Sequence, residues 1–113
     1  MFRGYGDDYL KVGDDVYHSG LMLHAGQVTA PWGPERLEAL GVEHLQPILA
    51  SPPEVLIIGT GRVTRFPGET VRDALQDAHI GYECMDSRSA ARTYNILVTE
   101  GRTTSAAMLL PAA

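Results

Sequence analysis

The chain has 113 residues, of which 44% are hydrophobic and 20% are charged, and its formal net charge is −5 at pH 7. This length and composition are typical of one globular domain with a single core, and they exclude an intrinsically disordered chain. The negative net charge argues against nucleic acid as a general partner, and no apolar run approaches the roughly 18 residues that a membrane span needs.

The first thirty or so residues predict a hairpin. Residues 14–24 form a strand in this interpretation, and they are apolar enough at residues 21–23 to be covered on both faces. Residues 25–27 favour a turn, and residues 28–30 return as a short second strand.

Short helices are expected next. A helix over residues 34–41 is favoured because a proline suits its first position, and it turns Leu37 and Leu40 inward. Residues 42–50 predict a second helical piece that is interrupted near Pro47.

The second half of the chain alternates strands with helices, which is typical of an α/β sheet with crossover helices. We expect strands over residues 54–58, 82–85 and 103–110. Thr70 is the expected cap of the intervening helix, whose apolar stripe has helical spacing and consists of Val71, Ala74, Leu75 and Ala78.

The last helix has the clearest boundaries. Asp86 and Ser87 begin it and Gly101 ends it, and aspartate is among the strongest N-cap residues. We therefore interpret Asp86 as a cap rather than as a ligand-binding group.

A glycine-bracketed turn, Gly59-Thr60-Gly61-Arg62, follows the strand over residues 54–58. It is not a dinucleotide fingerprint, because Thr64 stands at the third glycine position, and it is not a phosphate-binding P-loop. Ligands of open α/β sheets bind beyond the carboxyl ends of parallel strands, where this turn meets the start of the last helix. The predicted ligand-binding residues are Gly59, Thr60, Gly61, Arg62, Ser87, Arg88, Arg92 and Asn95.

Two of these assignments have structural alternatives. Asn95 either contacts a ligand or bonds a neighbouring loop backbone and holds the glycine turn in place. The arginines of the second half either gather into a positive patch or form ordinary solvated ion pairs, and they are Arg62, Arg65, Arg88, Arg92 and Arg102.

The cysteine and the histidines indicate no further site. Cys84 is the single cysteine, which excludes an internal disulfide and suits a reducing compartment, and in a strand it is expected to be a small buried hydrophobe. The four histidines lack metal-ligand spacing, so we expect no metal and no cofactor. The chain start has no apolar signal core, and we expect a cytoplasmic protein.

Several blocks occur together in a recognisable order: Gly4-Tyr5-Gly6, Trp32, Ile57-Ile58-Gly59-Thr60-Gly61, Met85-Asp86, Ala90-Ala91-Arg92-Thr93-Tyr94-Asn95 and Glu100-Gly101-Arg102. So ordered, they resemble the family that includes mitochondrial complex I assembly factor three and the adipogenesis-associated Mth-domain-containing protein. The resemblance implies a single α/β domain over residues 1–113, a three-layer fold with a mixed central sheet, flanking helices and an additional β-hairpin layer. It implies no established catalytic activity. We expect the chain to differ from mitochondrial relatives in having no targeting segment, and it carries Ser87 where many relatives have threonine.

Two functions remain open on this basis. The first is a non-catalytic interaction or assembly-type protein, linked to the biogenesis of a respiratory or membrane complex, with a protein partner and no insertion into the membrane. The alternative is a small anionic-metabolite-binding protein or enzyme that uses the Gly59–Arg62 turn with Arg88, Arg92 and Asn95.

Overall fold

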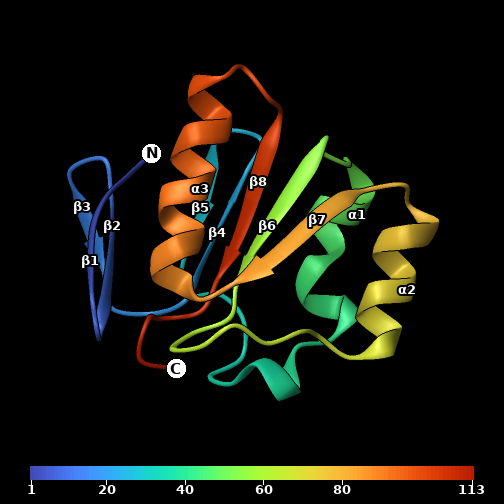
Figure 1. Ribbon diagram of the computed structural model, residues 1–113, viewed down its shortest axis with the longest axis horizontal. Coiled ribbons are helices and arrows are strands. Elements are labelled where there is room, and N and C mark those ends of the chain that lie inside the picture. Colours follow the sequence, from blue (N-terminus) through green and yellow to red (C-terminus); the bar gives the residue numbers. More distant parts are fainter.

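A five-stranded mixed sheet forms the centre of the computed structural model, which describes residues 1–113 (Figure 1). Its strand order is β5-β4-β8-β6-β7. Three of its strands are parallel to one another, namely β6 (Val55–Gly59), β7 (Gly81–Met85) and β8 (Thr104–Met108). The other two are antiparallel, namely β4 (Leu21–His24), which pairs with β8, and β5 (Gln27–Thr29), which pairs with β4.

Helices cover both faces of this sheet, and the alternation along β6 shows why. Leu56 and Ile58 point into one apolar cluster, whereas Ile57 between them points into another. The first cluster lies under two 3₁₀ turns and two helices, η1 (Leu37–Ala39), η2 (Val42–Leu45), α1 (Gln46–Ala50) and α2 (Glu69–Asp77). The second cluster lies under α3 (Ser87–Thr99) on the opposite face (Figure 1).

A second sheet of three antiparallel strands lies beside α3 and completes the fold. Its strands are β1 (Phe2–Gly6), β2 (Tyr9–Val12) and β3 (Asp15–Tyr17). Phe2 and Leu10 bury their side chains in the same cluster as the inner face of α3, and the Phe2 ring meets the Tyr94 ring edge-on at 5.4 Å between centroids. The mixed sheet, flanking helices and extra β layer are therefore confirmed.

The composition of that extra layer was not predicted. Residues 14–24 form no continuous strand: β3 belongs to the second sheet and β4 to the central one, so the chain crosses between sheets at residues 18–20. Gly20 permits the crossing, because a Cβ there would lie 2.6 Å from the carbonyl oxygen of Trp32.

Three helix predictions also need correction. The helix expected over residues 34–41 is only the 3₁₀ turn η1, although Leu37 and Leu40 are buried as predicted. The piece over residues 42–50 divides into η2 and α1, with Pro47 in the first turn of α1. Helix α2 is capped by Gly68 in an extended conformation, so Thr70 lies inside the helix instead of capping it.

None of the helices combines the length and the apolar character that crossing a membrane requires.

Candidate functional site

The glycine turn and the start of α3 meet at one edge of the central sheet, as the parallel arrangement of β6 and β7 requires. Gly59 at the end of β6 pairs with Met85 at the end of β7. Beyond these ends, the N–H of Ser87 donates to the carbonyl oxygen of Gly61 at 2.9 Å. The two loops are thus joined by backbone contact.

Ser87 holds this junction from inside the protein. Its side chain is fully buried, accepts a hydrogen bond from the N–H of Gly61 at 2.9 Å, and donates one to the carbonyl oxygen of Leu109 at 2.7 Å. The hydroxyl therefore connects the glycine turn, α3 and the segment after β8. Both of its hydrogen-bonding directions are used within the protein.

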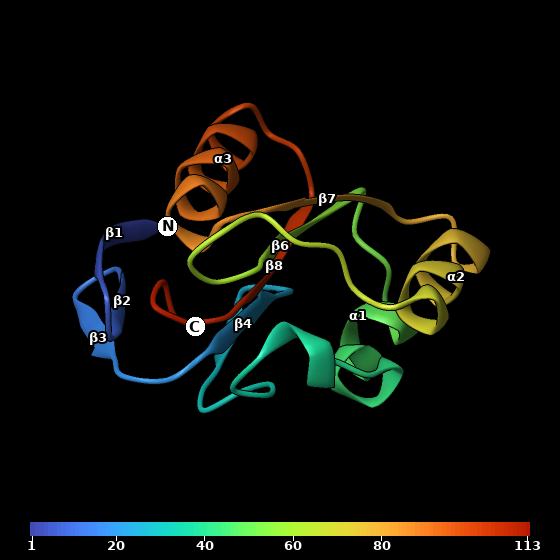
Figure 2. The same ribbon diagram turned by 60° about the horizontal axis from the view of Figure 1, so that its bottom comes forward.

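Thr60 fixes the loop that follows. Its buried hydroxyl donates to the carbonyl oxygen of Val63 at 2.6 Å and accepts from the N–H of Arg65 at 3.2 Å. The N–H of Arg62 donates to the carbonyl oxygen of Ala113 at 2.9 Å. We name residues 61–67 the arginine loop; it lies with the C-terminus at the lower end of the molecule in Figure 1, and Figure 2 turns this end toward the viewer.

The remaining predicted site residues point elsewhere. Arg88 forms an ion pair with Asp7 at 2.6 Å, and Arg92 donates to the hydroxyl of Tyr5 at 2.6 Å. Both arginines thus attach α3 to the N-terminal part of the chain and do not reach the arginine loop.

Asn95 attaches the same helix to β1. Its amide accepts from the N–H of Phe2 at 2.9 Å and donates to the carbonyl oxygen of Phe2 at 2.8 Å. In its structural alternative, Asn95 was expected to bond a loop backbone and hold the glycine turn in place. The backbone that Asn95 bonds belongs to β1 instead. The arginines of the second half accordingly form no common patch, and Arg102 pairs with Glu54 at 2.9 Å.

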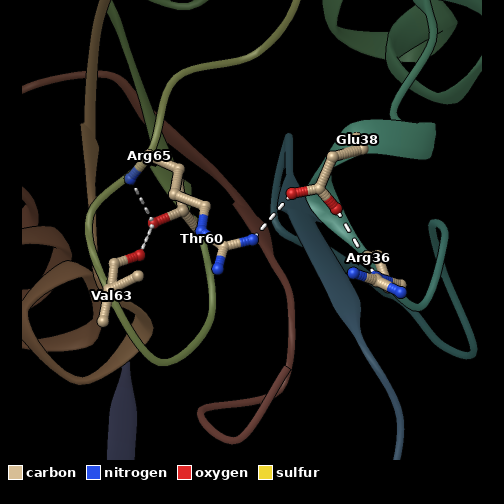
Figure 3. Close-up of polar contacts among 5 residues, drawn as sticks. All are labelled: Arg36, Glu38, Thr60, Val63 and Arg65. Carbon is tan, nitrogen blue, oxygen red and sulfur yellow. Dashed lines mark hydrogen bonds and ion pairs between the residues drawn. The ribbon is translucent and has the colours of Figure 1, made fainter.

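Arginines from two segments surround a cavity of about 300 Å³ beside the arginine loop. Arg36 precedes η1, while Arg62 and Arg65 come from the loop. Figure 3 shows the Glu38 carboxylate between two of these side chains: one oxygen lies 2.7 Å from Nη1 of Arg65 and the other lies 3.6 Å from Nε of Arg36. The remaining lining residues are Leu37, Thr60, Val63, Ala112 and Ala113.

Sequence reasoning did not place Arg36 at this site. It stands before the helical segment, 26 positions ahead of Arg62, and no local pattern connects the two.

Glu38 is charged at this site. A hydrogen bond from the backbone N–H of Glu38 to its own carboxylate, followed by the contacts with Arg65, lowers the pKa of Glu38 below its ordinary value of 4.5. Glu38 is therefore a carboxylate at neutral pH.

The arginine loop also exposes apolar side chains. Phe66 is 68% exposed and Val63 is 47% exposed, although the loop backbone between residues 60 and 65 is held by the Thr60 hydroxyl. The loop therefore combines two guanidinium groups, an aromatic ring and a branched aliphatic group on a braced backbone.

Titratable groups near the junction have structural roles. Asp86 caps α3 as predicted, accepting from the N–H of Ser89 at 3.1 Å, and hydrogen bonds from Ser89 lower the pKa of its carboxyl. Burial raises the pKa of the Cys84 thiol from 9.0 to about 11, which keeps it protonated at neutral pH. No three His, Cys, Asp or Glu side chains gather in a metal-binding arrangement.

Comparison with known proteins adds the following similarities. A family model described as "Protein of unknown function (DUF498/DUF598)" matches residues 2–109. An uncharacterized protein of Rhodobacter capsulatus is 33% identical over 107 residues, which cover 94% of this chain and 81% of that protein. A Francisella tularensis protein named 13 kDa major membrane protein is 32% identical over 108 residues, covering 93% and 86%.

A shorter match connects the chain to a eukaryotic protein. Human NADH dehydrogenase (ubiquinone) 1 alpha subcomplex assembly factor 3 is 36% identical over 58 residues, which cover 51% of this chain and 32% of that protein. The similarity therefore spans half of the chain and about a third of the human protein.

Solved structures share the fold over nearly the whole chain. The crystal structure of a Bordetella parapertussis protein has a TM-score of 0.88 and 34% identity, covering 97% of this chain and 94% of that one. The solution structure of a Bordetella pertussis protein, described as an Mth938-like domain, has a TM-score of 0.82 and 33% identity, with coverage of 99% and 86%.

Proposed function

The chain belongs to the DUF498/DUF598 family of proteins of unknown function, and we propose that it is a non-catalytic interaction protein that binds another protein through the arginine loop. The family includes relatives of the complex I assembly factor, as the resemblance implied. A shared fold alone does not assign an activity, so the proposal depends on the surface of this chain.

The single observation that carries the proposal is the exposed Phe66 on a braced loop that also carries Arg62 and Arg65. Aromatic residues and arginine are the residue types most enriched where protein interfaces have their strongest contacts, while lysine is depleted there. A loop whose backbone is already ordered loses little conformational entropy on binding, and this favours affinity.

The charge of the loop restricts the partner. The three arginines around the loop face only one carboxylate, Glu38, so the local charge is positive on a protein of net charge −5. We propose a partner with an acidic surface around an apolar recess that receives Phe66. Similarity to an assembly factor supports a subunit of a respiratory or membrane complex as the class of partner.

Affinity capture from cells that naturally produce the protein tests this function. Phe66→Ala should leave stability within about 0.5 kcal/mol, because the ring is mostly exposed in the free protein. If the ring is buried against a partner, the same change should weaken binding by about 30-fold, the equivalent of a 2 kcal/mol interface contact.

Ile96→Ala is the matched control, since Ile96 is 58% exposed on α3, away from the loop. The expected result is one protein complex enriched by the wild-type chain and by Ile96→Ala, and depleted with Phe66→Ala. Equal capture by all three proteins contradicts docking through the arginine loop.

A further inference from the structure

The cavity beside the arginine loop concentrates positive charge on an acidic protein. Three of the nine Lys and Arg residues of the chain line it, and the only carboxylate in ion-pair contact with them is Glu38. The three guanidinium groups thus outnumber the one side-chain carboxylate that pairs with them. Arg62 forms no ion pair within the chain, whereas Arg36 and Arg65 share the single partner (Figure 3).

Glu38 occupies the place that an external carboxylate would take. More than half of each side chain in the Arg65–Glu38 and Arg36–Glu38 pairs is exposed to solvent. Exposed ion pairs of this kind contribute little to stability, so exchanging Glu38 for another carboxylate costs the fold almost nothing. The contact geometry is already that of arginine recognising a carboxylate.

From these contacts we infer that the arginine cavity is a binding site for a small dicarboxylate, which displaces Glu38 from Arg65 and also engages Arg62. Its two carboxylates would pair with Arg65 and Arg62, and a volume of about 300 Å³ suits a ligand of a few carbon atoms. Leu37 and Val63 supply apolar contact for the carbon chain between the carboxylates.

A carboxylate is inferred here instead of phosphate because the anionic group that Arg36 and Arg65 already contact is the Glu38 carboxylate. Phosphate sites commonly use free backbone N–H groups, yet the N–H of Arg62 is bonded to Ala113 and that of Arg65 to Thr60. Helix α3 begins nearby, but Asp86 already caps its N-terminus. The guanidinium groups are therefore the main cations of the cavity, and they pair with a carboxylate in a bidentate manner.

The site is also ordered before a ligand arrives. The Thr60 hydroxyl donates to the carbonyl oxygen of Val63 and accepts from the N–H of Arg65. The Ser87 hydroxyl accepts from the N–H of Gly61. Arg62 and Arg65 are consequently presented from a fixed backbone, which reduces the entropy lost on binding.

Titration of the folded protein with succinate, followed by amide chemical shifts at low ionic strength, tests the inference. Saturable shifts are expected at residues 36–38 and 60–65. Arg62→Gln should weaken succinate binding about tenfold, the scale of one charged hydrogen-bond contact. Glu38→Gln should tighten binding, because it removes the internal competitor while keeping nearly the same side-chain shape.

Arg3→Gln is the control for overall charge: it makes the same charge change on β1, where Arg3 is exposed and forms no ion pair. Its succinate affinity should stay within about twofold of wild type, as expected for a distant exposed charge screened by salt. Unchanged backbone spectra establish that each variant is folded.

Four results would overturn the assignment. These are no saturable shift up to about 50 mM succinate, equal weakening by Arg3→Gln and Arg62→Gln, weaker binding in Glu38→Gln, or tighter binding of inorganic phosphate than of succinate. The outcome is independent of the docking proposal, which depends on Phe66 and on capture of a protein partner.

Discussion

Replacing Ser87 with alanine should destabilise the protein more than any other single-atom change at the site. The hydroxyl is fully buried and serves two backbone partners, the N–H of Gly61 at 2.9 Å and the carbonyl of Leu109 at 2.7 Å. Alanine fits the same space but leaves both groups without a hydrogen bond in the interior.

The magnitude follows from those two groups. An orphaned buried backbone group costs about 1–3 kcal/mol, so the loss of two partners should lower the free energy of unfolding by about 2–6 kcal/mol in Ser87→Ala. Unfolding entropy is about 2.1 cal/mol/K per residue, or about 240 cal/mol/K for 113 residues. A loss of about 3 kcal/mol therefore lowers the melting temperature by about 13 °C.

Urea unfolding followed by the fluorescence of Trp32, the single tryptophan, measures this loss. Ser51→Ala is the control, because Ser51 is exposed at the end of α1, away from the glycine turn. It should change the unfolding free energy by less than about 0.5 kcal/mol. A loss below about 1 kcal/mol in Ser87→Ala would refute the role of its hydroxyl as the brace of the glycine turn.

Three further predictions concern other parts of the fold. Asn95→Ala should accelerate amide hydrogen exchange in β1 and β2 and lower stability by about 1–3 kcal/mol, because both backbone groups of Phe2 lose their partner; unchanged exchange in β1 would contradict this. Gly20→Ala should lower the melting temperature, because its Cβ would lie 2.6 Å from the carbonyl oxygen of Trp32, and a melting curve like that of wild type would count against the close approach. A Cys84 pKa of about 11 in place of 9.0 should slow alkylation at pH 8 about 100-fold relative to the unfolded chain. Because the unfolded state releases this proton first, stability should also fall as pH rises from 9 to 11, and less so in Cys84→Ala.

Much of the second half of the fold could be predicted because its signals are local. Strand β6 is an apolar run bounded by prolines and a glycine, and α3 begins at an aspartate cap and ends before Gly101, which has a positive φ of 83°. The parallel pairing of β6 with β7 then brings Gly61 beside Ser87. Each of these steps needs only neighbouring residues and the usual handedness of crossover connections.

The first half resisted prediction because its structure depends on distant partners. Phe2 is fixed in β1 by Asn95, which lies 93 positions away in the chain. The division of residues 14–24 between two sheets depends on Gly20 meeting backbone from other segments, which no strand periodicity reveals.

The same limit applies to the site. Arg88 and Arg92 resembled ligand-binding residues because they begin α3 close to the glycine turn, but long side chains can reach other partners, here Asp7 and Tyr5. Arg36 lines the cavity because the fold brings the segment before η1 beside the arginine loop, and no local sequence pattern indicates this. The ligand-binding role of the glycine turn stays a prediction, and the structure adds Arg36 and Arg65 to its surroundings.

Site-specific photo-crosslinking in the native cell tests the docking claim most directly. A benzoylphenylalanine placed at position 66 reports whether another protein covers the exposed ring, and the same residue at position 96 reports on another mostly exposed site, on α3. We predict one discrete protein adduct from position 66 and none from position 96. Adducts from position 96 alone, or none from position 66, would contradict the proposal that this protein docks its arginine loop onto a partner.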